Sequence, residues 1–121
     1  MSKYNASFYP SIARTATPTE VPYSDDNVTG IQVIINVTAA TSTPSVVPAI
    51  DGYDPLSQTW YNILTGVAIT GTGATVLRVH PSMASASNVT AGDFLPETYR
   101  IVMTHGNSNS ITYTVGVNST S

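Results

Sequence analysis

Apolar and polar residues alternate in short segments along most of this chain. In the segment 30–38, one face carries four β-branched residues, which are Ile31, Val33, Ile35 and Val37. Near the C-terminus the same alternation places Ile111, Tyr113, Val115 and Val117 on one face. A period of two residues is the spacing of a half-buried β-strand. Since no segment of ten or more residues carries an apolar stripe at helical spacing, the sequence predicts an all-β fold.

Turn residues separate these segments. Asp54 and Pro55 fit the first two positions of a type I turn, and the strand expected over 59–64 follows it. Pro48 has no backbone N–H to donate, so it suggests a sheet edge or a bulge. About six to eight short strands with such turns predict an antiparallel β-sandwich, Ig-like or jelly-roll-like, with a barrel as the alternative.

The length of 121 residues predicts a single domain with three parts. Residues 1–29 contain three prolines and no sustained periodicity, which indicates an extended N-terminal arm with a short strand over 12–17. Residues 30–118 form the predicted sandwich, and residues 119–121 a polar tail.

The composition excludes several classes of function. The chain has no cysteine, which excludes a thiolate zinc site, an iron–sulfur cluster and a cysteine nucleophile. Its net charge is −3, and no lysine or arginine cluster is available to bind nucleic acid. No apolar run approaches the length of a membrane span, and the start lacks the apolar core of a secretory signal. We therefore expect no nucleic-acid partner, no membrane and no export.

The residues that acid–base or metal chemistry would need are few and scattered. His80 and His105 lie at the ends of predicted strands, and neither is near a Gly-x-Ser-x-Gly motif, so surface positions are the favoured interpretation. Asp51, Asp54 and Asp93 could together hold calcium, but Asp54 is better explained by its turn. We expect no enzyme, no cofactor and no metal, with a hydrolase using either histidine as a remote alternative.

Aromatic residues suggest two binding surfaces. Tyr53, Trp60 and Tyr61 flank one predicted hairpin and could stack on sugars, although a single tryptophan in a sandwich usually packs between the sheets. The second set lies in the arm, where aromatic side chains could anchor on a neighbouring protein. That set is Tyr4, Phe8, Tyr9 and Tyr23. If the arm is such a clamp, deleting residues 1–22 should abolish binding and leave the sandwich folded.

Several short motifs of this sequence together resemble those of one protein family. They are Gly-Tyr-Asp-Pro at 52–55, the aromatic pair Trp60-Tyr61, Leu95-Pro96 before a strand, and Ser-Ile-Thr-Tyr-Thr-Val-Gly at 110–116. Over about residues 30–117 the chain resembles the small β-sandwich structural proteins encoded among the head genes of tailed bacteriophages. Such proteins are often capsid decoration (cement) proteins that bind the outside of the shell as trimers or dimers.

The resemblance implies a structural virion protein, made in the host cytoplasm and located on the capsid surface, with the major capsid protein as its partner. The composition agrees, because only 4 Lys+Arg and 7 Asp+Glu leave little charge repulsion to oppose assembly. A domain associated with the tail, neck or fibre is the alternative within the virion. A carbohydrate-binding module is the alternative from another class.

Overall fold

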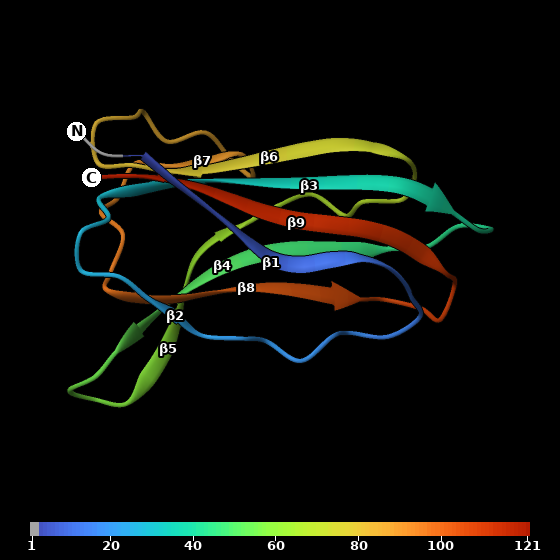
Figure 1. The fold of residues 1–121 in the computed structure, drawn as a ribbon, viewed down its shortest axis with the longest axis horizontal. Coiled ribbons are helices and arrows are strands. Elements are labelled where there is room, and N and C mark those ends of the chain that lie inside the picture. Colours follow the sequence, from blue (N-terminus) through green and yellow to red (C-terminus); the bar gives the residue numbers. More distant parts are fainter. Residues whose placement is uncertain (1–2) are drawn as a thin grey trace.

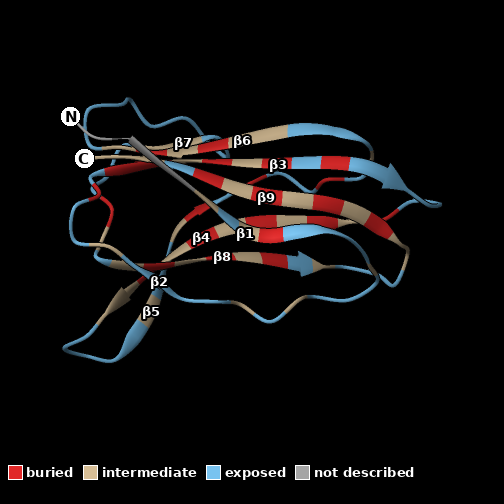
Figure 2. Cartoon of the chain, viewed as in Figure 1, coloured by how far each residue is buried: buried red, intermediate tan, exposed pale blue. Residues whose placement is uncertain are grey.

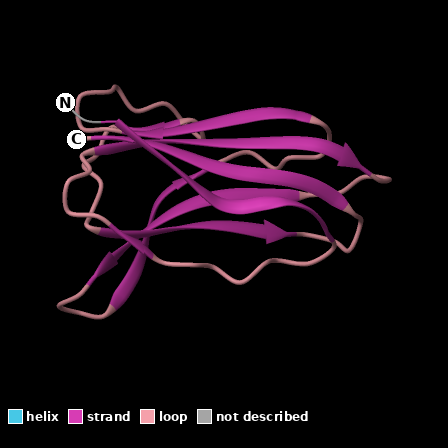
Figure 3. Cartoon of the chain, in the orientation of Figure 1, coloured by secondary structure: helices cyan, strands magenta, loops and turns pink. Residues whose placement is uncertain are grey.

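Every regular element in the described part of the chain is a β-strand. The computed structural model describes residues 3–121, with side chains from residue 6 onward. This range holds nine strands and no helix (Figure 3), and thus no helix long and apolar enough to cross a membrane. The strands are β1 (Lys3–Arg14), β2 (Tyr23–Ser24), β3 (Gly30–Ala40), β4 (Val46–Asp54), β5 (Thr59–Thr65), β6 (Gly73–Val79), β7 (Thr90–Ala91), β8 (Thr98–His105) and β9 (Ile111–Thr120).

The strands form two sheets. The five-stranded sheet has the order β1-β9-β3-β6-β7, and the four-stranded sheet has the order β2-β8-β4-β5 (Figure 1). All pairings are antiparallel except the short parallel contact between β6 and β7. The predicted antiparallel β-sandwich is therefore confirmed.

The order of pairing decides which kind of sandwich this is. β4 pairs with β5, β3 with β6, β2 with β8 and β1 with β9, so the pairs are nested about the β4–β5 turn. Successive pairs go alternately to the two sheets. A long antiparallel ribbon rolled up in this way is a jelly roll. An Ig-like sandwich would instead keep β9 beside β8, whereas here β9 lies between β1 and β3.

The apolar core lies between the sheets and follows the alternation seen in the sequence. The residues expected to face inward on β3 and β9 are all buried: Ile31, Val33, Ile35, Val37, Ile111, Tyr113, Val115 and Val117. On β8, Tyr99, Ile101 and Met103 are buried in the same way. Figure 2 shows buried bands alternating with more exposed ones along these strands. Each sheet thus turns one face outward, where a binding site can be built.

The first 29 residues, expected as an extended arm, supply two strands of the sandwich. β1 pairs with β9 from Lys3↔Thr120 to Arg14↔Ile111 and is the edge strand of its sheet. It is longer than the strand expected over 12–17. Two register shifts, on either side of Tyr9, interrupt its alternation. Such bulges bend a strand and break its period of two, which explains why the pattern in the sequence was indistinct.

The second half of this segment crosses to the other sheet. Residues 15–22 run beside β8 (Figure 1), and the backbone N–H of His105 donates to Thr17 Oγ1 at 2.9 Å. The two residues of β2 then pair with Thr98 and Tyr99 of β8. At the other end of the chain β9 continues to Thr120, so Ser119 and Thr120 of the expected polar tail lie in the sheet.

Pro48 lies on β4 between two partner strands, and its position explains how the sheet tolerates it. The pairing of β4 with β5 ends at Ala49↔Thr65, and a register shift follows Ile50. Beyond that point, Gly66 donates its N–H to the Pro48 carbonyl at 2.8 Å. The pairing resumes at the Val46↔Ile69 bridge, so Pro48 lies at an irregular point of the ladder, as expected for a proline at a bulge.

Candidate functional site

An aromatic pair lies on the outer face of the four-stranded sheet. Tyr53 on β4 is directly opposite Trp60 on β5, and their ring centroids are 4.9 Å apart with the planes tilted by 51°. The guanidinium carbon of Arg100 on β8 lies 4.2 Å from the centroid of the Trp60 ring. Arg100 occupies an outward position between the buried Tyr99 and Ile101. Three neighbouring strands thus bring two rings and a cation together.

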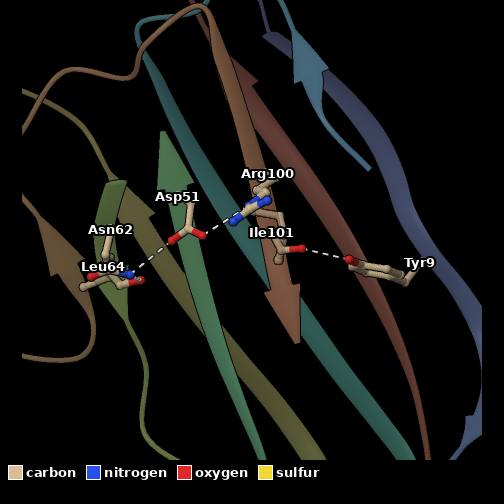
Figure 4. A network of polar contacts seen from close by, with 6 residues as sticks. All are labelled: Tyr9, Asp51, Asn62, Leu64, Arg100 and Ile101. Carbon is tan, nitrogen blue, oxygen red and sulfur yellow. Dashed lines mark hydrogen bonds and ion pairs between the residues drawn. The ribbon is translucent and has the colours of Figure 1, made fainter. Parts of the chain in front are cut away.

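A row of polar side chains continues from this cluster across the same face (Figure 4). Arg100 Nε lies 3.2 Å from Asp51 Oδ2, and both side chains are partly exposed. Asn62 Nδ2 donates to Asp51 Oδ1 at 3.3 Å and to the Leu64 carbonyl at 3.4 Å. These contacts fix an arginine, a carboxylate and an amide beside an aromatic ring. Polar groups around an aromatic platform are suited to binding a hydroxylated ligand.

Of the three aromatic residues expected to form one platform, only two lie together. Tyr61 is paired with Gly52, whose neighbours on β4 show that this position faces the other side of the sheet. A Cβ placed on Gly52 would lie 2.7 Å from both Tyr61 and Pro96, so the ring covers Gly52 closely. Burial, reinforced by the nearby Asp93 and Asp54 carboxylates, raises the pKa of the Tyr61 hydroxyl.

The favoured position of Trp60, between the sheets, was wrong. Trp60 is half-buried on the outer face and is absent from the apolar core. The physical reason is the register of the β4–β5 hairpin. Because Trp60 faces Tyr53, which follows the inward-facing Gly52, both rings must point outward. Arg100 and Asn62 were not expected in this site. The arginine could have been found from the sequence, because it lies at an outward position of a predicted strand.

The aromatic residues of the first segment differ in exposure: Tyr9 is buried, Phe8 is half-buried and Tyr23 is exposed. Phe8 and Tyr23 lie 5.9 Å and 5.7 Å from the buried Tyr99 ring, and 5.4 Å from each other. Tyr9 is only 5% exposed, and its hydroxyl donates to the Ile101 carbonyl at 2.8 Å (Figure 4). While β1 remains in the sheet, Tyr9 is unavailable to a partner. The Tyr4 side chain lies outside the described residues.

The tip of the β4–β5 hairpin is held by hydrogen bonds to one aspartate. Asp54 Oδ1 accepts the Leu56 backbone N–H at 3.1 Å, and Asp54 Oδ2 accepts Ser57 Oγ at 2.8 Å. These bonds lower the pKa of the Asp54 carboxyl below its usual value. The prediction that Asp54 serves the turn is confirmed. The neighbouring Leu56 is 96% exposed.

The two histidines have different surroundings. His105 Nε2 lies 3.0 Å from the Tyr113 hydroxyl, and burial, with the charge of Arg14, lowers its pKa. His80 Nδ1 accepts both the backbone N–H and the hydroxyl of Ser82. Within residues 3–121 the acidic and histidine side chains do not gather into a group of three that could hold a metal. Asp51 in particular is engaged with Arg100 rather than with Asp54 or Asp93.

No known protein-family model matches this sequence, and none of the curated proteins matches it. The fold by itself assigns no activity, because jelly rolls serve viral capsid proteins, lectins and enzymes alike.

Proposed function

We propose that this chain is a structural virion protein that decorates the outer surface of a phage head and stabilises it. The observation that carries the proposal is a group of exposed apolar side chains at one end of the sandwich, here called the hairpin end. Leu56 at the β4–β5 tip is 96% exposed, and Phe94 is 66% exposed. Tyr61 is the third member and is also exposed. Exposed aromatic side chains such as Phe94 and Tyr61 are of the type that is enriched in protein interfaces.

The hairpin end is suited to docking because it is ordered before contact. The β4–β5 hairpin projects beyond the body of the sandwich (Figure 1). The Asp54 hydrogen bonds hold its tip, and Tyr61 packs near Pro96, which follows Phe94 closely in the chain. Binding by a preordered loop loses less conformational entropy than binding by a flexible one. In this proposal Leu56 and Phe94 are buried against the major capsid protein.

The scarcity of charge supports the same role. Arg14 is occupied by the carbonyls of Pro10, Ile12 and Tyr113, and Arg100 by Asp51. Few cations thus remain to bind phosphate, and few like charges oppose the close approach of further copies. The proposal therefore includes a homo-oligomer, a trimer or dimer, on the capsid surface. It involves no enzymatic step, nucleic acid, membrane or cofactor.

The test is binding of purified protein to shells of the phage that encodes it, measured by co-sedimentation and by cryo-electron microscopy. We expect added density at the junctions between capsid subunits, and loss of binding for Leu56→Ser combined with Phe94→Ser. The matched control is Val67→Ser, because Val67 is also 66% exposed but lies in the loop after β5. Undecorated shells would contradict the proposal, and density on the tail instead would favour the tail, neck or fibre alternative.

A carbohydrate-binding module is the second candidate, favoured by the Tyr53–Trp60 pair with Arg100, Asp51 and Asn62 beside it. Trp60 is the only tryptophan, so its fluorescence reports directly on this face. A saturable change on adding polysaccharide, lost in Tyr53→Ala, would support this candidate. An unchanged emission spectrum across a panel of polysaccharides would contradict it.

A further inference from the structure

A cavity of about 440 Å³ opens on the outer face of the five-stranded sheet, on the opposite sheet from the aromatic pair. Its floor is formed where β3 begins and where β6 and β9 end. Met83, from the loop between β6 and β7, also lines it. That loop is tied to the sheet, because Arg78 N–H donates to the Val89 carbonyl and His80 N–H to the Ala91 carbonyl. The size lies within the range of small-molecule sites in proteins.

Three polar side chains line the cavity side by side. Gln32 is paired with Arg78 on one neighbouring strand and with Asn118 on the other. Asn118 Nδ2 donates to Gln32 Oε1 at 3.3 Å, which leaves the Gln32 amide nitrogen free to donate. Arg78 takes part in no ion pair within the described part of the chain. The row therefore presents unused N–H donors to the cavity.

His80 adds a further donor. Because Nδ1 accepts the Ser82 backbone N–H at 3.1 Å, the neutral ring carries its proton on Nε2. The ring lies close over Gly30, where a Cβ would come within 2.5 Å of its Cδ2 atom. Gly30 thus allows the imidazole to reach the cavity wall.

Two residues with hydroxyl side chains, Ser119 and Thr120, also line the cavity. Thr120 Oγ1 itself is shielded from solvent and makes no hydrogen bond with the described residues, so it is not a contact for the ligand. None of the described residues that line the cavity is acidic. An arginine, a histidine, two amides and two hydroxyl residues without a carboxylate form a set that favours an anion.

We propose that this cavity binds a small organic carboxylate of about monosaccharide size, such as a sugar acid. The carboxylate pairs with Arg78 and the Gln32 amide, and hydroxyl groups of the ligand bond to Asn118. Met83 supplies an apolar wall for the carbon skeleton. The volume exceeds what a simple anion such as acetate would fill. The inference does not depend on the proposed virion role, because the site shares no residue with the hairpin end.

The test is a titration of the full-length protein with glucuronate, followed by amide chemical shifts in two-dimensional NMR. We expect saturable shifts at Gln32, Arg78 and Asn118. Glucose, which has the same size without the charge, should give none. Arg78→Gln should weaken binding about ten- to a hundredfold, the usual effect of losing a charge-assisted bond.

Two further variants keep the result interpretable. Asn118→Ala removes a cavity side chain without changing the charge and should weaken glucuronate binding. Asn36→Ala is the matched control, because Asn36 is exposed on the same face of β3 but does not line the cavity. The proposal is overturned if glucuronate gives no saturable shift, if glucose binds equally well, or if inorganic phosphate binds with the same affinity. Equal weakening by Asn36→Ala would also overturn it.

Discussion

At the scale of single residues, one hydrogen bond joins the two sheets through the side chain of an edge strand. Tyr9 belongs to β1 of the five-stranded sheet, and its hydroxyl donates to the Ile101 carbonyl of the four-stranded sheet. That carbonyl lies on the part of β8 that extends beyond its pairing with β2. Tyr9 therefore satisfies a backbone group that would otherwise be unpaired at a sheet edge.

Replacing Tyr9 by phenylalanine should destabilise the fold by about 1–3 kcal/mol, because it leaves the Ile101 carbonyl unsatisfied while keeping the ring. Urea denaturation followed by circular dichroism measures the change. The control is Tyr23→Phe, which keeps its ring against Tyr99 and should have little effect. Equal destabilisation by both variants would contradict the special role of the Tyr9 hydroxyl.

His105 should make stability depend on pH in the mildly acidic range. Burial and Arg14 lower its pKa below the usual 6.5, so the unfolded chain binds the proton more readily than the folded protein. Stability is then complete above pH 6.5 and decreases as the pH falls toward the lowered pKa. Urea midpoints at about pH 7.5 and about pH 5.5 test this. His105→Gln should remove most of the difference, and an unchanged difference would contradict the prediction.

At the scale of elements, β1 is part of the sandwich rather than a detachable clamp. It completes the five-stranded sheet along β9, and Arg14 at its end stacks 4.5 Å over the Tyr113 ring. Arg14 also donates to the Tyr113 carbonyl at 2.9 Å. The sequence-based expectation that residues 1–22 can be deleted without unfolding the domain therefore needs revision.

Deleting residues 1–14 should cost at least about 3 kcal/mol, the usual loss for removing one buried aromatic side chain such as Tyr9. Thermal melts followed by circular dichroism test this. A synthetic peptide of residues 3–14 should restore stability by pairing with β9, whereas a peptide with Tyr9 replaced by serine should not. An unchanged melting temperature after deletion would show that β1 contributes little.

At the scale of the whole molecule, apolar contact rather than charge should govern association. The chain has only 11 formal charges, 4 Lys+Arg and 7 Asp+Glu, and its hairpin end exposes the apolar side chains of Leu56 and Phe94. Interactions between exposed charges are screened by salt, whereas burial of apolar surface is not weakened by it. Measuring binding to shells at several salt concentrations therefore distinguishes apolar contact from charged contact.

We expect co-sedimentation with phage shells to persist between about 0.05 M and about 1 M sodium chloride. The control is the double variant Leu56→Ser and Phe94→Ser, which should fail to bind at either concentration. Binding that disappears at high salt would place the contact on charged residues, and the assignment to the hairpin end would then be wrong.

Local alternation determined much of this fold. β3 and β9 are regular over several residues, so the sequence alone predicted which of their side chains face the core, and Asp54-Pro55 predicted the turn between β4 and β5. The full length of β1 was not predicted, because bulges on either side of Tyr9 break the period of two. Tyr53 and Trp60 could be grouped from the sequence because they lie on the two strands of one hairpin, but the sequence favoured a Trp60 packed between the sheets and grouped Tyr61 with them.

Only the tertiary structure decided which strands become neighbours. Many pairing orders bury the same apolar faces equally well, so alternation could not distinguish an Ig-like sandwich from a jelly roll. Arg100 joins Trp60 only because β8 lies beside β4, and Gln32, Arg78 and Asn118 meet only because β6 and β9 flank β3. Both sites are built across strands that are distant in the chain. The physical reason is that outward residues carry no apolar pattern, so the strand order alone brings them together.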